Sequence, residues 1–147
     1  MNLKVLNILL ADDDTDDCLF FKKALEELVF STNLTTVHDG EQLMNYLSDN
    51  SGNLPDILFL DLSMPRKTGL ECLTEIMQNK KLKDLSLVIL STSNSKETIN
   101  MVFKTGAHVY IHKPGDFAQL KQVIHHAFPI ATEKTFSNSP VKYILNA

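Results

Sequence analysis

The chain has 147 residues, of which 44% are hydrophobic and 22% charged, a composition typical of one globular domain rather than of a disordered or fibrous protein. Its 14 basic and 18 acidic residues give a net charge of −4, which argues against nucleic-acid binding as its main role. The early apolar run Ile8–Ala11 is far shorter than the roughly 20 residues of a membrane-spanning helix, and Asp12 follows it directly, so neither a membrane anchor nor a signal peptide is expected.

Short apolar runs alternate along the chain with longer segments in which apolar residues recur at helical spacing. Runs of this length that are apolar on both faces are typical of buried strands in a parallel sheet. Strand and helix alternating five times predict an α/β fold, a doubly wound, five-stranded parallel sheet with helices on both faces. In chain order, the runs and the apolar stripes that follow them are Val5–Ala11 with Cys18, Phe21, Leu25 and Leu28; Leu34–Val37 with Leu43, Met44 and Leu47; Ile57–Leu60 with Leu70, Leu73, Ile76 and Met77; Leu87–Leu90 with Ile99, Val102 and Phe103; and Val109–Ile111 with Leu120, Val123, Ile124, Ala127 and Phe128.

Several predicted helices carry residues that typically begin or end a helix. Asp14 precedes the first helix, Asp116 precedes the last, and Gly106 follows the fourth. Pro129 is expected to end the last helix, which divides the chain into a domain of residues 1–128 and a C-terminal tail of residues 129–147. The tail is too short for a second domain, so no output module is expected. Its apolar residues can pack back on the domain or onto a partner subunit; they are Val141, Tyr143, Ile144 and Leu145.

The two cysteines, Cys18 and Cys72, lie far apart and form no C-x-x-C pair. They predict buried free thiols in a reducing compartment, and therefore a cytoplasmic protein. The histidines show no zinc-ligand spacing with either cysteine, so a zinc site is not expected.

Ionisable and hydroxyl side chains follow four of the five predicted strands. Because the carboxyl ends of parallel strands meet at one edge of the sheet, where α/β proteins bind ligands, these side chains are expected to converge. Carboxylates, a hydroxyl and a lysine therefore gather at one edge. They are Asp12, Asp13 and Asp14 after the first strand, Asp61 after the third, Ser91 and Thr92 after the fourth, and His112 and Lys113 after the fifth.

The acidic cluster predicts a site for a hard divalent cation. Clustered carboxylates repel one another and raise each other's pKa unless a cation neutralises them. Mg²⁺ binds a few carboxylates and keeps water in its other positions, which suits this set. A calcium-binding EF-hand loop beginning at Asp12 is excluded, because Asp17 stands where the loop needs glycine and Lys23 where it needs glutamate.

Four motifs in this order and spacing resemble the receiver domain of two-component response regulators. They are ILLADDD, FLDLSMP with Gly69 four residues beyond Pro65, LSTS, and YIHKP. The resemblance covers Leu6 to Phe128 and implies a flavodoxin-like (βα)5 fold.

The resemblance also implies roles for individual residues. Asp61 matches the aspartate that accepts a phosphoryl group, and Lys113 matches the lysine that pairs with that group. For Mg²⁺, the matching positions are Asp12, Asp13 and Asp61 together with the backbone carbonyl of Ser63. Ser91 matches the hydroxyl, and Tyr110 the aromatic ring, of the conformational switch. The family pattern further suggests a cis bond between Lys113 and Pro114.

The function that the resemblance implies is a phosphoacceptor in a two-component phosphorelay rather than a turnover enzyme. Its expected partners are a sensor histidine kinase or phosphotransfer protein and a separate downstream protein. The surface of the fourth helix, fifth strand and fifth helix is the expected signalling face and the interface of a homodimer. No nucleic acid and no membrane is expected among the partners.

Two other functions share part of this residue pattern. A haloacid-dehalogenase-like phosphatase also uses a strand-end aspartate with magnesium, but it needs a second acid where Ser63 stands. A constitutive, non-phosphorylated binding module would not need the set of acids, hydroxyl and lysine to be intact, and here it is intact: Asp12, Asp13, Asp61, Ser91 and Lys113.

Overall fold

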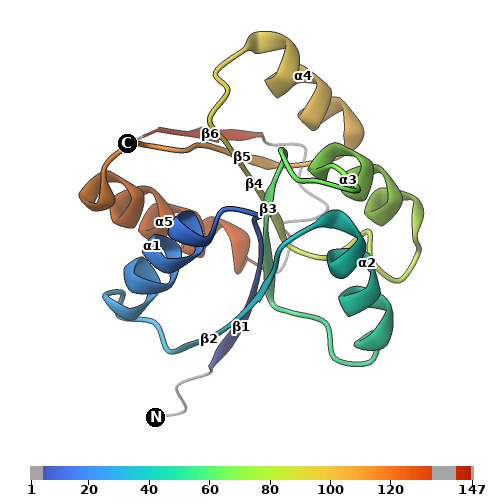
Figure 1. Ribbon diagram of the computed structural model, residues 1–147, viewed down its shortest axis with the longest axis horizontal. Coiled ribbons are helices and arrows are strands. Elements are labelled where there is room, and N and C mark those ends of the chain that lie inside the picture. Colours follow the sequence, from blue (N-terminus) through green and yellow to red (C-terminus); the bar gives the residue numbers. More distant parts are fainter. Residues whose placement is uncertain (1–4, 134–141, 147) are drawn as a thin grey trace.

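The computed structural model describes residues 5–133 and 142–146, which fold as one sheet with a layer of helices on each side (Figure 1). The predicted alternation of strands and helices is confirmed. In chain order the elements are β1 (Leu6–Ala11), α1 (Thr15–Glu26), β2 (Thr32–Val37), α2 (Gly40–Asp49), β3 (Ile57–Asp61), α3 (Gly69–Gln78), β4 (Leu87–Ser91), α4 (Lys96–Thr105), β5 (Val109–His112), α5 (Phe117–Ala131) and β6 (Tyr143–Leu145).

The sheet is parallel throughout, with strand order β2-β1-β3-β4-β5-β6. The chain adds β2 on one side of β1 and the later strands on the other, so β1 and β3 lie side by side where the strand order reverses. The fold class is as predicted, but the expected count of five strands is wrong, because the tail adds β6 beside β5. A strand of three residues, Tyr143–Leu145, is too short for sequence periodicity to reveal, and the unpaired edge of β5 gives it a partner.

Each face of the sheet has its own hydrophobic core. Helices α1 and α5 cover one face, and α2, α3 and α4 cover the other (Figure 1). Side chains alternate along the strands, so Ile8 and Leu10 face the first core while Leu9 and Ala11 face the second. Burial on both faces explains why these strands read as continuous apolar runs.

The predicted helix boundaries are confirmed at three positions and wrong at one. Asp14 and Asp116 are N-caps, and Gly106 ends α4 with φ of 127°, a conformation that favours glycine. Pro129 does not end α5, which continues to Ala131. Pro129 is exposed while Phe128 and Ala131 are buried, and Thr132 N still donates to Phe128 O at 3.0 Å, so packing holds the last turn despite the proline.

Three further expectations concern the tail, the prolines and the cysteines. Of the apolar tail residues, Tyr143, Ile144 and Leu145 form β6, whereas Val141 lies outside the described residues. The expected cis bond before Pro114 is wrong, since the peptide bonds of the described residues are all trans, the form favoured by about 0.5–1 kcal/mol. Both cysteines are buried and free, as predicted.

Within residues 5–133 and 142–146, no helix is both long and apolar enough to cross a membrane.

Candidate functional site

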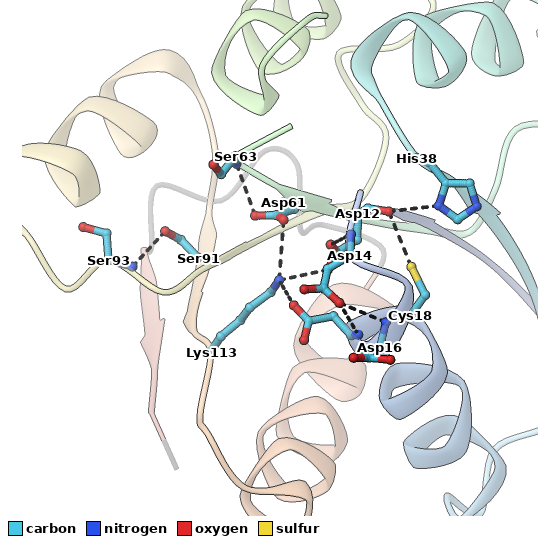
Figure 2. Close-up of polar contacts among 11 residues, drawn as sticks. Asp12, Asp14, Asp16, Cys18, His38, Asp61, Ser63, Ser91, Ser93 and Lys113 are labelled. Carbon is cyan, nitrogen blue, oxygen red and sulfur yellow. Dashed lines mark hydrogen bonds and ion pairs between the residues drawn. The ribbon is translucent and has the colours of Figure 1, made fainter. Parts of the chain in front are cut away.

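The carboxyl ends of β1, β3, β4 and β5 meet at one edge of the sheet and bring the predicted residues together (Figure 2). Asp61 is the last residue of β3 and Ser91 the last of β4. The backbone N–H of Lys113 donates to Ser91 O at 2.7 Å, which ties the residue after β5 to the end of β4. The predicted convergence is confirmed for the acids Asp12, Asp13 and Asp61 and for Lys113. Asp14 instead caps α1, and His112 Nε2 lies 3.0 Å from the carbonyl oxygen of the exposed Thr92.

Three carboxylates form the centre of the site. One oxygen from each of Asp12, Asp13 and Asp61 lies within 4.8 Å of the others. Asp12 and Asp61 are buried, whereas Asp13 is exposed at the rim. Hard carboxylate oxygens this close together suit a divalent cation, which would remove their mutual repulsion.

Lys113 supplies the positive charge of the site. Its Nζ donates to Asp12 Oδ2 at 2.9 Å and to Asp17 Oδ2 at 3.1 Å, and it lies 3.5 Å from Asp61 Oδ2. In Figure 2 the Lys113 side chain extends from the end of β5 toward Asp61 and Asp12. A cavity of about 190 Å³ opens beside it, with Asp12, Asp17 and Lys113 at its polar end and Phe20 and Phe117 among its apolar walls.

The pKa values of Asp61 and Lys113 are both raised, but for different reasons. Burial raises the pKa of Asp61 to about 6, Lys113 opposes this rise, and the neighbouring charge of Asp12 adds to it. Burial alone would lower the pKa of Lys113, but the hydrogen bond from Lys113 to Asp12 and the charges of Asp61 and Asp12 raise it above its ordinary value. Lys113 is therefore a permanent cation, and Asp61 is largely ionised at neutral pH.

Gly69 explains part of the motif that follows Asp61. A Cβ added at Gly69 would lie 2.1 Å from the carbonyl oxygen of Asp61, so any larger residue would push the end of β3 away. The glycine lets α3 begin directly against the strand, and its N–H donates to Leu62 O at 3.0 Å. The close approach fixes the position of the Asp61 backbone.

Two side chains that sequence reasoning assigned no role in the site hold the backbone of Asp12. Cys18 Sγ and His38 Nδ1 both donate to the Asp12 carbonyl, at 3.4 and 3.2 Å (Figure 2). Asp12 Oδ1 also accepts from the N–H of Asp14 at 3.0 Å. Burial raises the pKa of Cys18 to about 12, so its thiol remains protonated and able to donate.

Ser91 and Tyr110 are linked through a third residue, Ser93. Ser91 Oγ accepts from Ser93 N at 3.1 Å, and the Tyr110 hydroxyl donates to Ser93 O at 2.6 Å. Tyr110 is completely buried, with its ring among the side chains on the α2–α4 face of the sheet. Two hydrogen bonds through the backbone of Ser93 thus connect Ser91 to Tyr110.

The remaining predicted residue, Ser63, is exposed beside Asp61. Its N–H donates to Asp61 Oδ1 at 3.2 Å, a contact that orients the carboxylate. Sequence reasoning missed Asp17, Cys18, His38 and Ser93 as contributors to the site. Asp17 had a usable signal, because it stands one helical turn before the buried Phe21 and so lies on the inner side of α1.

Comparison with known proteins identifies the family. Residues 8–125 match the family described as the response regulator receiver domain. The chain belongs to this family. It resembles the probable methanogenesis regulatory protein FilR2 of Methanothrix harundinacea (strain 6Ac), with 29% identity over 120 residues, 80% of this chain and 77% of FilR2.

Solved receiver structures agree with both the fold and its extent. The phosphorylated cyanobacterial phytochrome response regulator RcpA superimposes with a TM-score of 0.78 at 29% identity, covering 95% of this chain and 98% of RcpA. The Mn²⁺-bound form of Rcp1, a response regulator of Synechocystis sp. (strain ATCC 27184 / PCC 6803 / Kazusa), gives a TM-score of 0.77 at 26% identity, covering 87% of this chain and 95% of Rcp1.

The receiver domain described here is thus homologous to phosphoacceptor response regulators, and its pocket of Asp12, Asp13 and Asp61 fits a phosphorylation site. Receiver domains are in general signalling modules rather than turnover enzymes. They interact with histidine kinases or phosphotransfer proteins and with downstream targets.

Proposed function

We propose that Asp61 accepts a phosphoryl group from a histidine kinase or histidine phosphotransfer protein, and that the new charge changes which proteins this receiver domain binds. The observation that carries the proposal is the position of Asp61 at the end of β3, within reach of the acids after β1 and of Lys113 after β5. Among the described residues, Asp61 is the carboxylate that ends a fully buried strand inside this cluster.

The reaction needs a nucleophile and neutralisation of charge. A carboxylate oxygen of Asp61 forms a bond to phosphorus as the bond from phosphorus to the donor histidine nitrogen breaks. The nitrogen keeps that electron pair and is protonated, and Asp61 becomes an acyl phosphate. Because phosphoryl transfer depends mainly on positioning and electrostatics, the ammonium of Lys113 is the protein group best placed to stabilise the transferred oxygens.

A resident Mg²⁺ would be held by Asp12, Asp13 and Asp61 with the backbone carbonyl of Ser63. The carboxylate oxygens grouped within 4.8 Å support this assignment, and Rcp1 has been solved with Mn²⁺. When bound, the cation supplies positive charge that offsets the charge of the carboxylates and of the phosphoryl oxygens.

The contacts of Ser91 and Tyr110 support their assignment as the conformational switch. The Ser91 hydroxyl donates a hydrogen bond to the phosphoryl group, and the contacts through Ser93 pass the resulting movement of Ser91 to Tyr110. The proposed signalling face comprises α4, β5 and α5, together with β6, which covers the edge of β5, and a homodimer through this face is part of the proposal. The receiver function is assigned to residues 1–128, and in the tail of residues 129–147 the first three complete α5 and Tyr143–Leu145 add β6 to the sheet. The two buried free thiols support a cytoplasmic location.

Mass spectrometry tests the proposal directly. Incubation with acetyl phosphate and Mg²⁺ should add the mass of one phosphoryl group, and mild alkali should remove it, because an acyl phosphate is alkali-labile. Asp61→Asn should remain unlabelled, whereas Asp16→Asn, which removes an exposed acid from α1, should be labelled like the unaltered protein. Equal labelling of Asp61→Asn, or the absence of an adduct in the unaltered protein, would show that Asp61 is not the acceptor.

A further inference from the structure

Asp17 is one of three carboxylates that surround the Lys113 ammonium. A lysine ammonium has three N–H donors. In the described part of the chain its carboxylate neighbours are Asp12 at 2.9 Å, Asp17 at 3.1 Å and Asp61 at 3.5 Å. The ammonium therefore makes hydrogen bonds with Asp12 and Asp17, and the proposed nucleophile is the most distant of the three partners.

The first turn of α1 places Asp17 within hydrogen-bonding distance of Lys113 but outside the acid cluster. Asp14 caps α1 and accepts from the N–H groups of Asp16 and Asp17, which fixes the first turn of the helix. Asp17 then faces the loop after β5, across 96 residues of sequence. It is not among the grouped acids Asp12, Asp13 and Asp61.

The two hydrogen-bonded acids differ in how easily they release Lys113. The Asp12 side chain is 2% exposed, so losing the lysine would leave a buried charge without its partner. The Asp17 side chain is 44% exposed, so water can replace the ammonium at small cost. Of the two bonds, the one to Asp17 is the easier to exchange.

We propose that Asp17 is a positioning residue that holds the Lys113 ammonium toward α1 before phosphorylation and competes with the phosphoryl group for it afterwards. This inference rests on the proposed function of Asp61. Asp17 would thereby shorten the lifetime of the phosphorylated state, because it draws positive charge away from the phosphoryl oxygens that Lys113 neutralises.

A purely structural role for Asp17 makes a different prediction. Acids in the first turn of a helix stabilise it through the helix dipole, and α1 has two there, Asp16 and Asp17. If Asp17 acted only in this way, Asp16→Asn and Asp17→Asn would behave alike. Asp16 lies next to Asp17, carries the same charge and makes no contact with Lys113, so it is the matched control.

The first test measures the lifetime of the acyl phosphate after acetyl phosphate and Mg²⁺ have been removed by gel filtration. The lifetime is measured rather than the labelling rate, because removing any acid makes the protein less negative and so favours the approach of the anionic acetyl phosphate. Hydrolysis uses neutral water and is not affected in this way. Asp17→Asn should lengthen the lifetime about two- to fivefold, the range of a partly exposed ion pair. Asp16→Asn should leave it unchanged, and Asp17→Glu, which keeps the carboxylate, should restore a lifetime close to that of the unaltered protein.

The second test needs neither metal nor phosphate. In NMR spectra of the unphosphorylated protein with a chelator present, the Lys113 ¹⁵Nζ signal should shift and its ammonium hydrogens should exchange with water faster in Asp17→Asn but not in Asp16→Asn. If thermal melting shows that Asp17→Asn is unfolded, Asp17→Ser takes its place, and the same results are expected.

The outcomes separate this inference from the proposed function. If the unaltered protein forms no adduct, the proposed function fails, while the NMR comparison still decides whether Asp17 holds Lys113. If the adduct forms but Asp17→Asn and Asp16→Asn have equal lifetimes, or if their Lys113 signals are alike, the role of Asp17 as a competitor is wrong and the proposed function stands.

Discussion

Burial of the Asp61 carboxylate, the proposed phosphoacceptor, is a cost to folding. The carboxylate must be ionised to attack phosphorus, yet burial raises its pKa to about 6 from the 3.8 of an exposed aspartate. Between these two pH values the folded state binds more protons than the unfolded state. The free energy of unfolding should therefore fall as pH rises through this window, and the loss should be complete above about pH 6.

Removing this charge should stabilise the protein at neutral pH. Without metal, we expect Asp61→Asn to be more stable than the unaltered protein by about 1–3 kcal/mol above pH 6, with little difference near pH 4. Urea unfolding with a chelator at the two pH values measures the difference. The exposed-acid control Asp16→Asn should stay within about 0.5 kcal/mol of the unaltered protein at both values. A less stable Asp61→Asn at neutral pH would contradict the burial argument.

The acids after β1 should differ in their effect on Mg²⁺ affinity. Asp13 is exposed at the rim, whereas the Asp12 carboxylate is already neutralised by Lys113. We expect Asp13→Asn to weaken Mg²⁺ binding more than Asp12→Asn does. Asp14→Ala should leave the affinity nearly unchanged while costing about 1 kcal/mol of stability, because Asp14 caps α1. Calorimetric titration with Mg²⁺ measures these affinities. If Asp14→Ala weakened binding the most, the assignment of the metal ligands after β1 would be wrong.

At the scale of elements, the tail is a structural part of the sheet. Strand β6 pairs with β5, and Tyr143 and Leu145 pack partly buried against the α1–α5 core. Lys142 Nζ donates to Ala107 O at 3.1 Å and lies over the ring of Phe103, which connects the tail to the end of α4. The tail therefore braces one edge of the proposed signalling face.

Removing β6 should lower stability without unfolding α5. Because α5 extends to Ala131, the informative truncation ends at Glu133. We expect a loss of about 1–3 kcal/mol from the exposed core surface, seen as a melting temperature lower by several degrees. Leu145→Ala should reproduce part of this loss, and the half-exposed Ile144 should tolerate alanine better. An unchanged melting temperature in the truncated protein would show that β6 contributes nothing.

At the scale of the whole molecule, a short chain of contacts joins the site to the proposed signalling face. Ser91 at the site, Ser93 in the following loop and Tyr110 in β5 are connected by two hydrogen bonds. A tenfold change in partner affinity requires about 1.4 kcal/mol, which one charge-assisted hydrogen bond to the phosphoryl group can supply.

Ser91→Ala should separate phosphorylation from signalling. The nucleophile, the acids and Lys113 remain, so labelling by acetyl phosphate should persist. In the unaltered protein, amide hydrogen exchange of α4 and β5 should change about tenfold or more on phosphorylation. The Ser91→Ala variant should show no such change, whereas Thr92→Ala, which removes an exposed hydroxyl from the next residue, should keep it. A full response in Ser91→Ala would mean that the signal takes another route.

The alternation of five strands with five helices, and the residues at the strand ends, could be predicted from the sequence because apolar periodicity and chain order are local properties. Since parallel strands end at one edge, the sequence also placed Asp61, Asp12 and Lys113 together. Three features became visible only in the folded protein: the sixth strand, the continuation of α5 past Pro129, and the bond between Asp17 and Lys113. These features depend on packing and on distances between residues remote in sequence, where burial and an available partner outweigh local preference.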